Sequence, residues 1–159
     1  MNAFNLTRYA LLALVAVSLG AWAVRTWSSS GSGDSSAVVS KPLPADGVVV
    51  INFHGATRCA SCEEIGKEAN AVVEKDFASD LQSGRMTWQV INYDEPANRH
   101  YVQDYGLVSS TVVVVRREGG RDAVWRRLDA VWDHVFDAPA MNAYLRREIT
   151  QISTTAATP

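Results

Sequence analysis

The stretch 51-INFHGATRCASCEEIGKEANAVVEK-75 contains both cysteines of the chain, Cys59 and Cys62, in a C-x-x-C spacing. An apolar run rich in β-branched residues, 48–53, precedes it and predicts a strand buried on both faces. After Cys62 the apolar residues recur at helical spacing, at Ile65, Ala69, Val72, Val73 and Phe77. The cysteine pair therefore lies between a strand and the start of a helix. This pair is a redox device, a metal clamp or a structural staple.

The residues that follow alternate between strand and helix patterns. Residues 86–94 and 110–115 predict strands, and Pro96 suits the first turn of a helix that runs to about Tyr105. The turn 117-REGGRD-122 leads into a further strand, 123–129, and Asp137 opens the last helix. Trp88, Trp125 and Trp132 have the spacing of core members of these elements. The predicted order is β-α-β-α-β-β-α, an α/β fold.

The N-terminal residues 1–27 predict a membrane anchor or a signal peptide. Residues 9–24 are uncharged and lie between Arg8 and Arg25. As a helix they would extend about 24 Å, somewhat short of the roughly 30 Å hydrocarbon core of a bilayer. The small-x-small sequence AWA, 21–23, also fits a cleavage site. Both interpretations export the remaining chain, and the anchor predicts a single-pass inner-membrane protein whose domain faces the periplasm or the cell exterior.

The composition of the rest of the chain predicts a linker, one domain and a tail, and it argues against a nucleic-acid partner. Residues 28–47 are rich in Ser, Gly and Pro and predict a flexible linker, 48–152 form one domain, and 153–159 form a disordered tail. The 15 Lys and Arg residues against 17 Asp and Glu give a formal charge of −2, so no nucleic-acid partner is expected. No nucleotide- or flavin-binding pattern appears, so we expect no cofactor in the chain itself.

A strand followed by C-x-x-C at a helix start, with this element order, resembles the thioredoxin superfamily over residues 48–152. The stretches 53-FHGATRCASC-62, 90-VINYDEPANRHYVQDYGL-107 and 128-LDAVWD-133 are more closely similar to a family of exported thioredoxin-like proteins, the nitrophenyl-compound nitroreductase subunits of the ArsF type. The resemblance implies a thioredoxin-like three-layer fold with a central mixed sheet. It also implies a protein thiol or disulfide partner, or a membrane redox subunit.

The residues themselves indicate how the cysteines would divide the chemistry. A thiol at a helix N-terminus faces unpaired backbone N–H groups and the positive end of the helix dipole, which favour the thiolate. Cys59 is therefore the predicted nucleophile, and Arg58 beside it favours the thiolate further. Cys62, one turn along the helix, is the predicted resolving thiol that attacks a mixed disulfide at Cys59.

Three departures from the thioredoxin pattern change what the resemblance implies. Ala60 and Ser61 replace the usual Gly-Pro pair between the cysteines. Asn52 stands where thioredoxins have a buried acid, and Val90 where they have its lysine partner, so His54 or water would have to accept the proton of the resolving thiol. Ser110 replaces the usual cis-proline, and the Ser109–Ser110 bond is expected to be trans because a cis bond before a non-proline residue is costly.

The two other uses of the cysteines stay open at this stage. As a staple, a disulfide that closes four residues would contribute only about 2 kcal/mol, between residues that the helix already holds together. A closed zinc site needs four ligands, and only His54 lies near the cysteines in sequence. Two chains could instead share an iron–sulfur cluster through four thiolates. We favour thiol–disulfide exchange through Cys59 and Cys62, with His54, Arg58 and Ser110 as possible accessory residues and with no metal.

Overall fold

The computed structural model describes residues 42–155. They form a four-stranded sheet in the order β2-β1-β3-β4, in which β1 runs parallel to β2 and antiparallel to β3, and β4 is antiparallel to β3. The strands are β1 Gly47–His54, β2 Met86–Asn92, β3 Thr111–Glu118 and β4 Arg121–Arg127. The helices are α2 Ala60–Asp76, α3 Ala78–Gln82, α4 His100–Asp104 and α5 Ala138–Thr154, with 3-10 turns η1 Pro96–Asn98 and η2 Asp129–Trp132.

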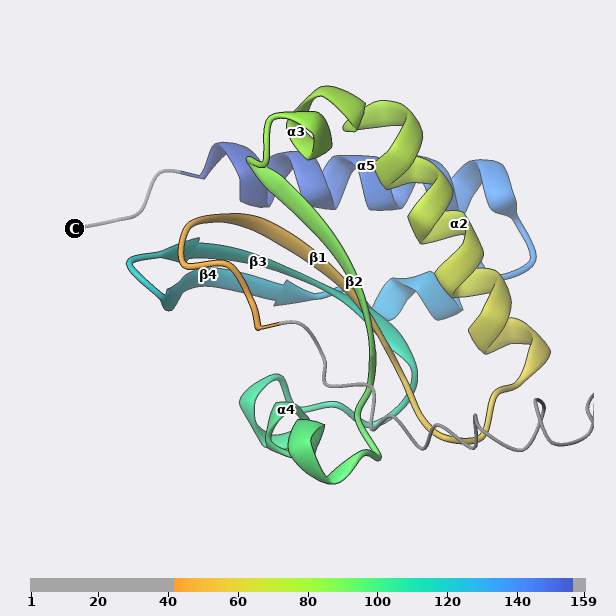
Figure 1. The fold of residues 1–159 in the computed structure, drawn as a ribbon. Coiled ribbons are helices and arrows are strands. Elements are labelled where there is room, and N and C mark those ends of the chain that lie inside the picture. Colours follow the sequence, from red (N-terminus) through yellow and green to blue (C-terminus); the bar gives the residue numbers. More distant parts are fainter. Residues whose placement is uncertain (1–41, 156–159) are drawn as a thin grey trace, which may run out of the picture. The chain divides into compact units, whose positions relative to one another are not determined.

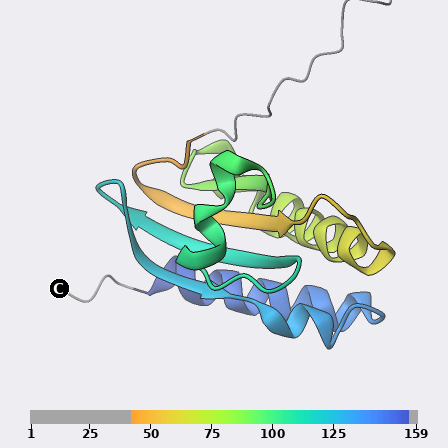
Figure 2. The same cartoon turned by 90° about the horizontal axis from the view of Figure 1, so that it is seen from below.

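The sheet lies between two layers of helix, as Figures 1 and 2 show. α2 and α5 pack against each other on one face, and η1 and α4 lie on the other. The element order and the mixed sheet confirm the predicted α/β, thioredoxin-like three-layer fold.

The central strand β1 is buried on both faces, as its unbroken apolar sequence predicts. Val50 joins the core beneath α2 and α5, whereas Val49, Ile51 and Phe53 join a second core on the α4 side. β3 alternates in the same way, with Val112 and Val114 toward α2 and α5 and Val113 and Val115 toward α4. Two cores therefore hold one strand pair in place.

Element boundaries differ from the predicted ones at several points. α2 begins at Ala60, with Cys59 as its N-cap, so both cysteines belong to the helix start. The helix predicted from Pro96 to Tyr105 is divided into η1 and α4. The short helix α3 was not predicted. Gly119 and Gly120, with φ of 58° and 80°, make the two-residue turn between β3 and β4, as expected for a turn that requires positive φ at both positions.

The prediction that Trp125 belongs to the core is wrong. Trp88 and Trp132 pack against the core beneath the helices, but Trp125 is 43% exposed and meets the Tyr105 ring edge-on at 5.2 Å between centroids. β4 is an edge strand, and most of its residues, Trp125 included, are exposed. Alternation along a strand places a side chain on a face, but it does not say whether that face is covered.

The predicted anchor at 1–27, most of the linker and residues 156–159 lie outside the described residues. β1 begins at Gly47, the last predicted linker residue, and α5 ends at Thr154, two residues beyond the predicted end of the domain. Between residues 42 and 155 no helix has the length and apolar character needed to cross a membrane.

A charged group is enclosed where β4 meets α5. Glu148 of α5 is 7% exposed and pairs with Arg126 of β4 and with Arg147, whose Nη2 lies 2.9 Å from Glu148 Oε1. Burial alone would raise the pKa of Glu148, but hydrogen bonds from Arg126 and Arg147 outweigh that effect and lower the pKa below its ordinary value of 4.5. The carboxylate therefore stabilises the packing of α5 on the sheet in its ionised form.

We predict that Glu148→Gln lowers the free energy of unfolding at pH 7 by about 1 to 2 kcal/mol. Because the folded pKa is lowered, this stabilisation is fully present above the unfolded pKa and is lost as the pH falls through the folded one. Denaturant unfolding at pH 7 and below pH 4 measures the loss. The control, Glu64→Gln, breaks an exposed pair with Lys67 and should change the free energy of unfolding much less than Glu148→Gln does. A pH-independent effect of Glu148→Gln would contradict the account.

Candidate active site

Cys59 and Cys62 form a disulfide at the N-terminus of α2. Their Cα atoms lie 5.0 Å apart, a distance that a disulfide normally spans. β1 ends at His54, and a five-residue loop, 55–59, connects the end of this strand to the helix (Figure 1). The buried strand thus determines where the cysteine pair lies.

The two sulfurs have different surroundings. Cys59 is exposed, and its Sγ accepts a hydrogen bond of 3.1 Å from the backbone N–H of Cys62. Cys62 is half-buried, one turn into the helix. A negative charge on Cys59 Sγ would already face a helix N–H group and the positive end of a 17-residue helix. The arrangement can supply an accessible thiolate with a second, shielded thiol beside it.

His54 and Arg58 are in contact with each other. An Arg58 Nη2 donates to His54 Nε2 at 2.8 Å, and His54 Nδ1 lies 2.8 Å from the Gly55 carbonyl oxygen. Because a guanidinium only donates and a carbonyl only accepts, these two contacts make Nε2 the acceptor and Nδ1 the donor of the ring. Arg58 is next to Cys59 in sequence, but its guanidinium is bound to His54, the last residue of β1. In this arrangement both nitrogens of His54 are occupied.

Ser110 lies at the same end of the sheet. Phe53 is paired with Thr111, which places Ser110 opposite the end of β1. Ser110 is 5% exposed, its carbonyl accepts from Trp132 Nε1 at 2.9 Å, and residues 42–155 contain no cis peptide, as predicted for Ser109–Ser110. The pKa of Tyr93 is raised, chiefly by burial and also by the Asp94 carboxylate. A hydrogen bond with the Ser110 side chain opposes this rise. Ser110 is therefore hydrogen-bonded to this aromatic framework through both its carbonyl and its side chain.

Asp94 was not anticipated from the sequence, although it holds the loop before Cys59. Its Oδ2 accepts from the Ala56 backbone N–H at 2.7 Å, and its own N–H donates to Asn92 Oδ1 at 3.0 Å. The Asp94 carboxylate and the Tyr93 hydroxyl lie 3.0 and 3.1 Å from the position that a Cβ on Gly55 would take. The signal in the sequence was the polar Asn-Tyr-Asp run that ends the second strand. Parallel pairing of β1 and β2 brings their ends to the same edge.

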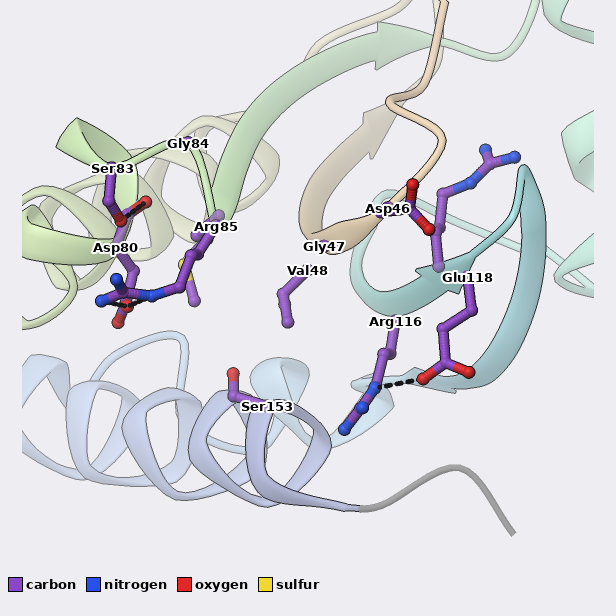
Figure 3. A pocket seen from close by; sticks show the side chains of 12 residues that line it. Asp46, Gly47, Val48, Asp80, Ser83, Gly84, Arg85, Arg116, Glu118 and Ser153 are labelled. Atoms are coloured by element: carbon purple, nitrogen blue, oxygen red, sulfur yellow. Dashed lines mark hydrogen bonds and ion pairs between the residues drawn. The ribbon is translucent and has the colours of Figure 1, made fainter. Parts of the chain in front are cut away.

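In the part of the chain that the structure describes, no three His, Cys, Asp or Glu side chains are grouped as metal ligands. A cleft of about 540 Å³ lies at the start of β1, the end opposite to the cysteines (Figure 3). Four of its charged groups form two ion pairs, Arg85 with Asp80 at 2.6 Å and Arg116 with Glu118 at 2.9 Å. This cleft takes no part in the cysteine chemistry.

No protein-family model and no curated protein sequence match the chain. Among solved structures it is similar to the zinc-bound form of human ERp44, with 18% identity, a TM-score of 0.42 and coverage of 66% of this chain but only 27% of ERp44. It is also similar to the thioredoxin of Malassezia sympodialis (19% identity, TM-score 0.45, covering 71% and 81%) and to that of Fasciola hepatica (16%, 0.37, 67% and 81%). The fold assignment rests on the element order and sheet topology rather than on these similarities.

We predict that Asp94→Ala loosens the loop that leads to Cys59. Removal of the acceptor leaves the Ala56 N–H without its partner and should lower the free energy of unfolding by about 1 kcal/mol. Hydrogen exchange should accelerate in residues 54–58 and change little in β3. The control, Asp94→Asn, retains a carbonyl oxygen and should restore most of the protection. Unchanged exchange at 54–58 in Asp94→Ala would show that Asp94 does not hold this loop.

Proposed function

We propose that the chain is an exported, membrane-tethered thiol–disulfide oxidoreductase or electron-relay subunit. The observation that carries the proposal is the disulfide between an exposed sulfur at the N-cap of α2 and a half-buried one a turn further along. A structural staple gains nothing from an exposed sulfur at a helix N-terminus, whereas exchange with another protein requires one. The thioredoxin-like fold agrees with this chemistry.

The exchange needs only the two sulfurs and a partner dithiol or disulfide. The Cys59 thiolate attacks a partner disulfide, so that a Cys59–partner bond forms and one partner sulfur leaves as a thiolate. Cys62, as thiolate, then attacks Cys59 Sγ, forms the Cys59–Cys62 bond and releases the second partner thiolate. Two electrons pass from the chain to the partner. The reverse sequence oxidises a partner dithiol.

Two features of the sequence support export and a membrane partner. The uncharged segment 9–24, between Arg8 and Arg25, fits an anchor or signal peptide, and both place the domain in a compartment where a disulfide persists. The similarity to exported ArsF-type nitroreductase subunits supports a membrane redox subunit as partner. The competing function is a non-catalytic subunit whose cysteines form a static disulfide or hold a metal or iron–sulfur cluster.

We predict that Cys62→Ser accumulates mixed disulfides with a partner and that Cys59→Ser accumulates none. In Cys62→Ser the exposed nucleophile can still attack, but no thiol in the chain can resolve the product. Non-reducing electrophoresis of cells that express each variant, with identification by mass spectrometry, measures the adducts. Equal trapping by both variants would contradict the division of roles, and no trapping by either would favour the non-catalytic subunit.

The orientation can be tested with the same variant. Cys59 is the only thiol in Cys62→Ser, because the chain has two cysteines. After mild reduction, a thiol reagent that cannot cross membranes should label Cys59 in intact cells, since the domain is proposed to face outward. Labelling only after lysis would show that the domain is inside.

A further inference from the structure

β2 is an edge strand that lacks the features which normally keep sheet edges from pairing. The two edges of the described sheet are β2 and β4 (Figure 1). Natural proteins protect such edges with charged side chains, proline or bulges. Four of the seven residues of β4 are charged, and its pairing with β3 contains a register shift. β2, 86-MTWQVIN-92, has no charge and no proline, and it pairs with β1 without a break in register.

The outer edge of β2 presents backbone groups that can pair with a further strand. The N–H of Val48, which lies opposite Met86, donates to the Arg85 carbonyl at 2.9 Å. In parallel pairing this directs the backbone groups of odd-numbered β2 residues toward β1 and those of even-numbered ones outward. No described backbone group bonds to the outward N–H and C=O groups of Met86, Trp88 and Val90.

Two side chains of β2 also lack a neighbour. Val90 is 47% exposed, on the sheet face where Met86 and Trp88 join the core beneath α2 and α5. Gln89, on the opposite face, is half-buried, and its Nε2 has no acceptor in the described residues. An apolar side chain and an amide donor are therefore both left without partners on this edge.

We propose that β2 pairs with β2 of a second copy of this chain, antiparallel, about a twofold axis at Gln89. Trp88 of each copy then lies opposite Val90 of the other, and their outward backbone groups bond to each other. The indole covers the exposed valine, as in other aromatic and β-branched cross-strand pairs. The two Gln89 side chains lie directly opposite each other, so each amide can donate to the oxygen of the other.

The self-complementarity of β2 favours a second copy as its occupant. Because the strand carries no charge, no like charges meet at the axis. Beyond the strand ends, the same register places Arg85, whose side chain is 67% exposed, opposite Tyr93 of the other copy and next to its exposed Asp94. The twofold axis repeats this juxtaposition of opposite charges at both ends of the interface.

The geometry of such a dimer is compatible with two tethered chains. The twofold axis is perpendicular to the sheet, so both α2 and α5 layers lie on one side of the dimer. Leu43 packs on the opposite face of the sheet, which places the entry of both chains on one side. Antiparallel pairing also separates the two disulfides, one at each end of the joined sheet. The dimer itself does not depend on the proposed function.

Disulfide crosslinking tests the pairing in the full-length chain. A Cys59→Ser/Cys62→Ser background has no cysteine, so Gln89→Cys supplies one thiol per copy. Directly opposed residues of a non-hydrogen-bonded antiparallel pair have Cα atoms about 4.5 Å apart, which a disulfide spans. We expect mild oxidation of membranes to give a covalent dimer, read by non-reducing electrophoresis. The matched control is Ala123→Cys, exposed on β4, which should give little dimer.

Charge substitution at the axis tests the same register without crosslinking. Gln89→Lys and Gln89→Glu each place two like charges opposite each other, so each should weaken the dimer about tenfold or more. An equal mixture of the two variants should restore it as a heterodimer, which shows that neither variant is misfolded. Sedimentation of the full-length chain in detergent measures the association.

The outcomes decide whether β2 pairs with itself. Equal crosslinking at positions 89 and 123, or none at position 89, would overturn the proposal, and so would a mixture of the charged variants that stays monomeric. If the linker or a strand of another protein covers β2 instead, copies with Gln89→Cys will not crosslink. Partner trapping by Cys62→Ser is a separate measurement, so the dimer and the proposed oxidoreductase can fail independently.

Discussion

β1 is hydrogen-bonded to β2 on one side and to β3 on the other, and both of its faces are buried. A strand enclosed in this way cannot shift by one residue without moving Val50 and Ile51 to opposite cores, so its register is fixed. Its end at His54 therefore has a fixed position, and the five-residue loop that follows places Cys59 at the start of α2. The strand thus determines where the cysteines lie.

The site combines an exposed sulfur with surrounding segments that are held in place by hydrogen bonds. Cys59 is exposed at the helix N-terminus, where its Sγ accepts from the Cys62 N–H. The loop that precedes it is fixed by the hydrogen bond from Ala56 to Asp94, and the Ser110 carbonyl accepts a hydrogen bond from Trp132. Exchange with a partner requires accessibility at the first sulfur and controlled geometry at the second. The structure shows an exposed Cys59 at the N-cap of α2 and a half-buried Cys62 one turn further along the helix.

Local patterns predicted most of the fold. The apolar run at 48–53 and the helical spacing from Ile65 to Phe77 reflect burial that repeats along one element, and C-x-x-C marked the site. Contacts between distant residues were not predictable in the same way. Asp94 meets Ala56 across 38 positions, and Asn52 meets Gly66 only because α2 returns across β1. Trp125 was misplaced because the sequence does not show which sheet face a helix will cover.

The central claim is that the Cys59–Cys62 disulfide exchanges reversibly. The most direct measurement is equilibration of the purified full-length chain across a graded series of glutathione and dithiothreitol buffers, with the thiol content read by alkylation and mass spectrometry. The account predicts one reversible two-electron transition, with a midpoint between about −120 and −270 mV, the range of exchange-active dithiols. A disulfide that stays fully oxidised to below about −300 mV, the range of structural disulfides, would contradict it.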